Sequence, residues 1–322
     1  MRKLLLTVAF AALGFASASA QDFPSRPVTL VAPFPAGGAT DIVSRIMAEH
    51  MKTTLGQTVL VENVTGAAGT IGMGRVVRAD PDGYTLVVGQ WTTHIGAGAL
   101  YPLNFHVLND FQPISLLTSS PLWIVGKNAL PAKNLKELIA WLKANPDKAS
   151  AGTVGAGSAA HVCLIYFRNG TDTKFQDVPY RGAAPVQQDL VAGQLDLSCL
   201  EAGQTLGNVR GGKYRVFAVM AKKRFAPAPD VPTVDEAGAP GLHFPFWHGL
   251  WAPKGTPKPV VAKLTAAVQA AFADAAVQKR FATLGMEIPP RDQQTPDALY
   301  AHHKAEIDKW WPIIKKAGIR VN

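Results

Sequence analysis

The chain has 322 residues, of which 48% are hydrophobic, so it can build the cores of two ordinary domains or one large one. Its formal net charge of +9 comes from Lys and Arg residues that are scattered along the chain. A nucleic-acid-binding protein would gather basic residues in a stripe with aromatic residues between them. The composition therefore argues against a nucleic-acid partner and leaves a solvated basic surface that is compatible with anionic solutes.

The N-terminus has the pattern of a secretory signal peptide. Arg2 and Lys3 precede an apolar run at residues 4–15, and the small residues 18–20 fit a cleavage site. The run is too short to span a bilayer, and no other segment sustains about 18 apolar residues. We expect cleavage near Ala20, a mature chain of 322 − 20 = 302 residues in the periplasm, and no membrane insertion.

Short β-branched runs alternate with longer helical patterns, which predicts an α/β fold with mainly parallel sheets. The expected strands, in chain order, cover residues 28–33, 58–61, 86–88, 122–126, 150–153, 195–200 and 216–220. The expected helices follow the glycine-rich segments 35–41 and 66–74 and then cover residues 135–144, 159–167, 186–191, 260–284 and 296–317. Thr40 or Asp41 can cap the first helix.

The strand and helix pattern starts again near residue 120, which indicates a second domain. Residues 222–259 are rich in proline and are expected to form a long surface connection that returns to the first domain.

Two glycine turns, PFPAGGATD at 33–41 and GTVGAGSAAH at 152–161, each follow a predicted strand and open a predicted helix. A helix N-terminus carries unpaired N–H groups and the positive end of the helix dipole, so it suits an anion. One such turn in each half of the chain indicates a clamp around a single acidic solute. The alternative is that each segment is only a tight turn between a strand and a helix.

A nucleotide site is weakly indicated and is rejected. Residues 155–160 fit G-x-G-x-x-A, but a lone match is not specific, and its acidic ribose partner would have to be Asp177, just before Val178. The P-loop and H-E-x-x-H patterns do not occur, and two cysteines cannot complete a zinc site of four ligands. We expect no cofactor and no metal.

Ser158 and His161 lie three residues apart at a helix start, so they could share a face. The nucleophile elbow G-x-S-x-G is missing, and no acid stands where it would orient the histidine. No catalytic residue is assigned, and a secreted hydrolase that uses Ser158 and His161 remains the alternative function. Ser158 otherwise caps the helix or contributes a hydroxyl to a ligand.

Several further polar and aromatic residues have two open interpretations. The residues that could line a pocket or belong to the core are Trp91, Trp247, His248 and Trp251. His302 and His303 are expected to face solvent on the last helix. Glu201 ends a buried strand, where it meets solvent or contacts the variable end of a ligand. Cys163 and Cys199 form a disulfide or remain buried thiols.

The chain resembles the tripartite tricarboxylate transporter receptors, also called the Bug or TctC family, almost from end to end. The matching segments are RPVTLVAPFPAGGATDIVSR, VENVTGAAGTIGMGRVVRADPDGYTL, AGTVGAGSAAHV, VPYRGAAPVQQDLVAGQLDL, DVPTVDEAGAPG, WHGLWAPKGTPKPVV and the closing helix that contains KW. They stand in the family's order and spacing, which makes the resemblance specific.

The resemblance implies a type II-like Venus-flytrap fold of two α/β domains joined by crossing strands. Domain 1 would cover residues 21–122 and 248–322, and domain 2 residues 123–247. It also implies a monomeric receptor without enzymatic activity that captures a small carboxylate, such as an aromatic acid or a dicarboxylate, in the cleft between the domains. The partner would be the permease subunits of a tripartite tricarboxylate transporter, or else a membrane sensor kinase.

The resemblance assigns ligand contacts by position, through backbone amides, hydroxyls and bridging waters. The first loop contributes Phe34, Pro35, Ala36, Gly37, Gly38 and Thr40; the second contributes Thr153, Gly157, Ser158, Ala159 and His161; and Gln90, Trp91, Thr92, Tyr180, Arg181 and Gly182 border the cleft. The chain departs from the family at Cys199, Leu200 and Glu201, where a phenylalanine and an aspartate are common. Glu201 would pair with a ligand amine and would repel a second carboxylate unless a cation, water network or proton intervened.

Overall fold

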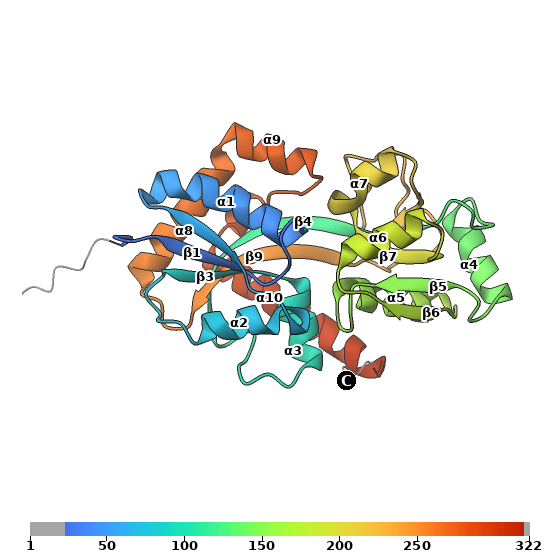
Figure 1. Ribbon diagram of the computed structural model, residues 1–322, viewed down its shortest axis with the longest axis horizontal. Coiled ribbons are helices and arrows are strands. Elements are labelled where there is room, and N and C mark those ends of the chain that lie inside the picture. Colours follow the sequence, from blue (N-terminus) through green and yellow to red (C-terminus); the bar gives the residue numbers. More distant parts are fainter. Residues whose placement is uncertain (1–22, 319–322) are drawn as a thin grey trace, which may run out of the picture.

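The computed structural model describes residues 23–318, so the predicted signal peptide lies outside the described residues (Figure 1). The strands are β1 (Val28–Ala32), β2 (Val59–Asn63), β3 (Thr85–Gln90), β4 (Phe111–Gly126), β5 (Ser150–Thr153), β6 (Gln176–Pro179), β7 (Leu197–Glu201), β8 (Arg215–Val219) and β9 (Pro245–Pro253). The helices are α1 (Ala39–Leu55), α2 (Thr70–Val77), α3 (Ala97–Leu100), α4 (Leu135–Ala144), α5 (Ala159–Thr171), α6 (Ala183–Val191), α7 (Ala202–Arg210), α8 (Lys258–Ala273), α9 (Ala275–Thr283) and α10 (Pro296–Lys316). Three short segments complete the described elements: the 3-10 turns η1 (Ala67–Gly69) and η3 (Arg291–Gln293) and the π-helical η2 (Thr92–Gly96).

The α/β prediction is confirmed, and the strands join into a sheet of nine in the order β2-β1-β3-β9-β4-β7-β5-β6, with β8 on β4. We use lobe 1 for the part built on β1–β3 with α1, α2, α8 and α9, and lobe 2 for the part built on β5–β8 with α4–α7. The pairs β1–β2, β1–β3, β5–β6 and β5–β7 are parallel, as predicted. The pairs made by β4 and β9 are antiparallel, so the whole sheet is mixed.

The two long strands β4 and β9 run from one lobe into the other (Figure 1). β4 pairs with β9 from Phe111 to Pro121 and then with β7 and β8 from Leu122 to Gly126. Because both crossing strands are ladder-bonded to each other, they form a paired connection between the lobes.

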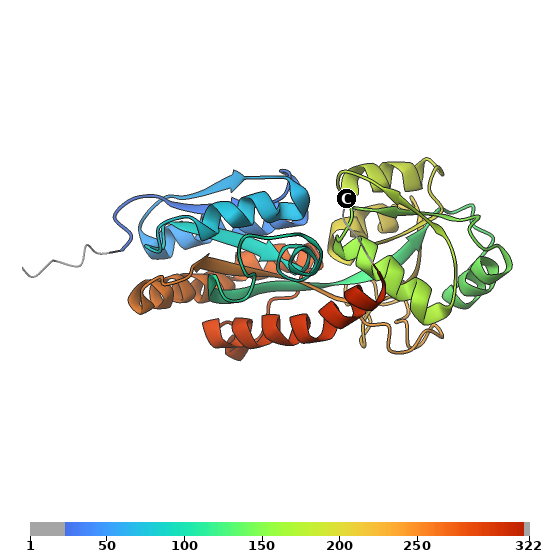
Figure 2. The same ribbon diagram turned by 90° about the horizontal axis from the view of Figure 1, so that it is seen from below.

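Helix α10 covers the crossing strands from the side opposite α1 and reaches from lobe 1 to lobe 2 (Figure 2). Trp310 of α10 packs on Phe244 at a ring-centroid distance of 4.4 Å and on Tyr166 of α5 at 5.2 Å. The carboxylate of Glu306 accepts hydrogen bonds from the indole N–H groups of Trp247 and Trp310. This buried cluster therefore links α10 to α5 of lobe 2 and to the crossing strand β9.

Three expectations about the elements are wrong. The proline-rich connection contains β9, which is buried along nearly its whole length. The long helix predicted at 260–284 is broken, because the carboxylate of Asp274 accepts hydrogen bonds from the first free N–H groups of α9. Thr40 and Asp41 do not cap α1, because the helix begins at Ala39 and places both in its first turn.

Cys163 of α5 and Cys199 of β7 form a disulfide, with a Cα–Cα distance of 6.2 Å. The alternative of two buried thiols is therefore wrong. Within residues 23–318, no single helix is long and apolar enough to cross a membrane, and α8 with α9 meets those criteria only as a pair bent by 74°.

Candidate functional site

The N-terminus of α1 has free backbone donors. Gly38 is the N-cap residue, and no side chain caps the helix. Across residues 23–318, no acceptor is described for the N–H groups of Ala39, Thr40 and Asp41. Three unpaired N–H groups at the positive end of a helix of 17 residues form a place where an anion is stabilised.

Asp41 fixes the loop that precedes this helix end. Its Oδ2 accepts the N–H of Gly37 at 2.9 Å and the Nε–H of Arg45 at 3.0 Å, and its Oδ1 accepts from Asn63. Burial would raise the pKa of Asp41, but the hydrogen bonds from Arg45, Gly37 and Asn63 outweigh it and hold that pKa below the usual value. Asp41 therefore stays ionised, and both of its carboxylate oxygens already accept hydrogen bonds from the protein.

The N-terminus of α5 is engaged differently. Ser158 is its N-cap, and the serine Oγ accepts the N–H of His161 at 3.2 Å. The N–H of Gly157 donates to His161 Nδ1 at 3.1 Å. The N–H of Ala159 donates to Oγ1 of Thr92 at 3.1 Å, so the end of α5 in lobe 2 is bonded to η2 beside lobe 1.

The Ser158–His161 pair does not have the geometry of a nucleophile and its base. His161 accepts at Nδ1 from Gly157, and its Nε2 lies 3.7 Å from Oδ2 of Asp177. Both ring nitrogens therefore have other neighbours, while the serine oxygen accepts from backbone. A general base must instead hydrogen-bond the hydroxyl that it deprotonates.

A polar strip crosses the strands between the two helix ends; we define it as Gln90, Thr118, Ser120, Glu201 and His248. Gln90 of β3 and Thr118 of β4 both stand opposite His248 of β9, and residues opposite each other in antiparallel pairs lie on the same face. Ser120 follows Thr118 by two residues, which keeps it on that face. Glu201 is opposite Leu122, two residues further along β4. The strip therefore runs from lobe 1 to lobe 2.

Thr40 connects the strip to the end of α1. Its Oγ1 is 3.3 Å from His248 Nε2, while Thr118 Oγ1 is 3.2 Å from Nδ1 of the same ring. Burial lowers the pKa of His248 to about 3, so the ring is neutral near pH 7. His248 therefore lies against the first turn of α1 without a charge of its own.

Two oxygens in the strip have no described partner. They are Oε1 of Gln90, a residue only 7% exposed, and Oε1 of Glu201, which is 6% exposed. Burial raises the pKa of Glu201 to about 8, and the hydroxyl of Ser120 offsets part of that rise. Buried polar atoms are nearly always hydrogen-bonded, so these two mark places where a bound molecule would complete the bonding.

The other residues that are predicted to contact the ligand from the two glycine loops differ in their exposure. Pro35, Ala36 and Gly37 are exposed in the α1 loop, and Phe34 is half-buried there. Thr153, at the end of β5, is buried and its carbonyl accepts the N–H of Tyr180.

The side chains at 180 and 181 are not directed into the strip by any described contact. Tyr180 donates its hydroxyl to Asp189 at 2.5 Å, and that bond raises the pKa of the tyrosine to about 12. Arg181 is exposed, and Gly182 is the N-cap of α6 with a φ of 119°.

The tryptophans and one histidine belong to the core. Trp91 is fully buried and packs between Phe244 and Trp310. Trp247 and Trp251 are also buried. The expectation that His303 faces solvent is wrong: it is 1% exposed and its Nε2 lies 3.0 Å from the carbonyl oxygen of His94.

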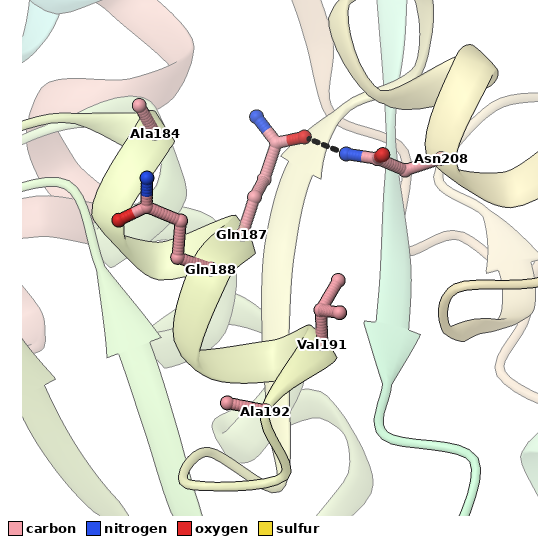
Figure 3. A pocket seen from close by; sticks show the side chains of 6 residues that line it. All are labelled: Ala184, Gln187, Gln188, Val191, Ala192 and Asn208. Carbon is pink, nitrogen blue, oxygen red and sulfur yellow. Dashed lines mark hydrogen bonds between the residues drawn. The ribbon is translucent and has the colours of Figure 1, made fainter.

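Two surface hollows lie elsewhere. One is between α6 and α7, where Gln187 accepts a hydrogen bond from Asn208 (Figure 3). The other is beside the start of β4 and includes Tyr300 of α10. Neither contains a residue of the polar strip. In the part of the chain that the structure describes, no three His, Cys, Asp or Glu residues gather as metal ligands.

Two α/β lobes joined by crossing strands, with helix ends directed at their junction, define a protein of the solute-binding receptor class. A family model described as the tripartite tricarboxylate transporter family receptor matches residues 43–319. A UPF0065 protein of Agrobacterium vitis is 41% identical over 306 residues, which cover 94% of this chain and 87% of that protein. The chain belongs to the tripartite tricarboxylate transporter receptor family, also called Bug or TctC.

Solved structures agree with this membership. The periplasmic binding protein BugD is 41% identical, with a TM-score of 0.85 and coverage of 92% of this chain and 99% of that one. MatC from Rhodopseudomonas palustris, solved with bound malate, is 38% identical, with a TM-score of 0.85 and coverage of 91% and 100%. The family and its solved members are substrate-binding proteins, which are periplasmic.

Proposed function

We propose that this receptor captures a small carboxylate at the junction of its lobes, with the acid group at the N-terminus of α1. The observation that carries the proposal is the set of three unpaired N–H groups at Ala39, Thr40 and Asp41, beside the neutral ring of His248. A carboxylate is small enough to accept two or three of these bonds, and bonds to a charged acceptor are the stronger kind.

We expect residues of both lobes to border this position. Gln90 and Thr40 come from lobe 1, and the hydroxyl of Thr92 is already bonded to Ala159 of lobe 2. The side-chain amide of Gln90 has no partner at Oε1, and a half-turn of that amide would direct its NH₂ group at the acid. The bound malate of MatC supports a carboxylate as the ligand class.

The proposal extends to how the receptor works. Residues 21–122 with 248–322 and residues 123–247 would act as two domains that close on the ligand about the paired crossing strands. The closed monomer would dock on the permease subunits of a tripartite tricarboxylate transporter in the periplasm. The family description supports this partner, and co-purification with either the permease or a sensor kinase distinguishes the two.

Isothermal titration with matched acids and amides tests the proposal. Malate, succinate and benzoate serve as acids, and succinamide and benzamide serve as neutral controls of the same shape. We expect at least one acid to bind with a single site per chain and its amide to bind at least about 10-fold more weakly, because the amide lacks the negative charge. Equal binding of an acid and its amide, or turnover of esters that Ser158→Ala abolishes, would contradict the proposal.

A further inference from the structure

Glu201 lies where lobe 2 meets the crossing strands. It is the last residue of β7 and the N-cap residue of α7, and its side chain does not cap that helix. The disulfide at Cys199, two residues earlier, ties this strand end to α5, whose N-cap is Ser158 and whose first residue is Ala159. The carboxyl group is therefore held in place at the lobe-2 end of the polar strip, opposite the end that meets α1.

The surroundings of Glu201 contain no described positive partner. β4 contributes the hydroxyl of Ser120, β9 contributes the apolar Phe246 opposite Ser120, and the chain after α9 contributes the carbonyl of Leu284 against Gly203. Glu201 takes part in none of the ion pairs of residues 23–318.

The charged groups near the junction are paired with one another or exposed. Asp41 is paired with Arg45 on α1. Asp177, which follows α5, lies beside Arg168 and His161. Arg181 and Glu287 are exposed. The strip thus presents a carboxyl oxygen without a partner and no cation to neutralise a second anion.

We propose that Glu201 is the specificity-determining residue of a distal subsite that binds a protonated amine, so that the ligand is an amino carboxylate. This inference rests on the proposed function, which assigns the ligand's carboxylate to the end of α1. The ammonium group would donate to the unpartnered Oε1 of Glu201 and exclude water from it.

The competing ligand is a dicarboxylate, the class to which the malate in MatC belongs. Beside Glu201, a second carboxylate would be a like charge in a buried place, and it binds only if a proton is shared between the two acids. An ammonium group needs no such proton and forms a charge pair instead. The two ligand classes therefore need opposite protonation states of Glu201: an ammonium group pairs with the ionised acid, and a second carboxylate needs a shared proton.

The proton balance follows from the burial of the carboxyl group. Burial raises the pKa of Glu201 to about 8, so the empty subsite holds a proton near pH 7. Binding an ammonium group ionises Glu201 and releases that proton to solvent, so the affinity for an amino carboxylate rises as the pH approaches 8. Binding a dicarboxylate keeps the proton, so that affinity falls over the same range.

Isothermal titration with paired probes tests the inference in the full-length mature protein. Each pair exchanges one carboxylate for an ammonium group on the same carbon chain: succinate with 3-aminopropanoate, glutarate with 4-aminobutanoate, and adipate with 5-aminopentanoate. Titration in two buffers of different ionisation enthalpy gives the number of protons released. The variants are Glu201→Gln and, as a charge-matched control, Glu287→Gln at an exposed position.

We expect the amino member of the best-binding pair to bind at least about 10-fold more tightly than its diacid, with proton release. Glu201→Gln should remove the preference and the proton release, and Glu287→Gln should keep both. Tighter binding of the diacid by the natural chain, or an amino preference that survives Glu201→Gln, overturns the inference. If no paired probe binds but malate or benzoate does, the inference is overturned and the proposed function stands. If none of the paired probes, propanoate, malate and benzoate binds, the proposed function itself fails.

Discussion

Glu201 and His248 are titratable side chains that the fold buries without a charged partner. Burial disfavours the charged form of each group, so the pKa of the acid rises to about 8 and that of the histidine falls to about 3. Both side chains are therefore neutral at pH 7 until a ligand brings a charge to them. The strip between the lobes is polar but uncharged, and the donors at the end of α1 provide its positive potential.

The raised pKa of Glu201 predicts how stability depends on pH. In the unfolded chain the group ionises near its usual value of 4.5, while the folded chain keeps the proton until about pH 8. The folded state therefore binds more protons between these values, and the stabilisation present below pH 4.5 is lost as the pH rises toward 8.

We expect the ligand-free natural protein to lose on the order of a few kcal/mol between pH 5 and pH 8 from this group. Glu201→Gln should remove that loss, because the amide cannot ionise, and should raise the urea midpoint at pH 8 relative to the natural chain. Denaturation of both proteins and of Glu287→Gln at the two pH values checks this. Parallel profiles for the natural chain and Glu201→Gln would show that Glu201 is already ionised in the folded state.

At the residue scale, the sequence shows that Glu201 ends a strand, and the structure confirms that it does. It does not show that Glu201, Ser120 and His248 share a face, because they come from three strands whose register depends on two bulges in β4. The prediction that His303 faces solvent is wrong for a related reason. Its partner His94 lies 209 positions away, and no local pattern reveals that contact.

Helix α5 begins at the junction of the lobes and strand β7 ends there, and one covalent bond joins them. The disulfide lies four residues inside α5 and two residues before the end of β7. It therefore sets the distance between the Ser158 turn and Glu201, which a change in the packing of lobe 2 would otherwise alter.

We expect removal of this disulfide to lower the stability of the protein. The double variant Cys163→Ser, Cys199→Ser should lower the free energy of unfolding by about 2–4 kcal/mol. Thermal unfolding measures this effect, and reduction of the natural chain with dithiothreitol should reproduce most of it. A variant as stable as the oxidised natural chain would contradict a structural role for the bond.

The sequence predicts elements well where a pattern is local. The first strand and the turn after it are recognisable because a β-branched run leads into glycines and a helical repeat. β9 was missed because it is buried on both faces between β3 and β4, so it shows no alternation, and prolines stand at its two ends. The break at Asp274 was missed because the apolar pattern continues across it.

The lobes of the whole molecule meet closely at Gly96. A Cβ atom on that residue would lie 2.3 Å from the carbonyl oxygen of Gly157, on the opposite lobe. Nearby, Thr92 accepts the N–H of Ala159, and on the other side of the junction Gly203 touches the carbonyl of Leu284. The described arrangement is therefore one in which the lobes are in contact on two sides.

Gly96→Ala should obstruct this contact between the lobes, because the added methyl group would collide with the carbonyl oxygen of Gly157. The backbone at Gly96 is helical, with φ −62°, so alanine causes no backbone strain. The added Cβ would obstruct mainly the carbonyl of Gly157, and it would lie 3.2 Å from the ring of Trp91, which must yield slightly. We expect ligand affinity to fall about 5-fold to 100-fold and the radius of gyration with saturating ligand to increase. Gly207→Ala is the matched control, because a Cβ there meets nothing within 4 Å. Unchanged affinity and scattering for Gly96→Ala would mean that the lobes do not meet in this way.

At the scale of the whole chain, the resemblance carried by seven separated segments gave the two-lobed fold, and the structure and its relatives confirm that fold. The role of α10 could not be predicted, because the contacts of Trp310 with Phe244 and Tyr166 join parts of the chain that are far apart in sequence. The domain boundaries and the ligand contacts stay predictions.

The central claim, an acid group held by the backbone at the start of α1, is tested most directly by removing one N–H. Proline at the first position of a helix keeps the helix and deletes the donor, and Gly38 has the extended conformation that a residue before proline needs. Ala275→Pro at the same position of α9 is the control, since Asp274 bonds the N–H groups of Ala276 and Val277 instead. Titration with the tightest acid should give about 10-fold to 100-fold weaker binding for Ala39→Pro and no change for Ala275→Pro. Natural affinity in a folded Ala39→Pro protein would contradict the claim.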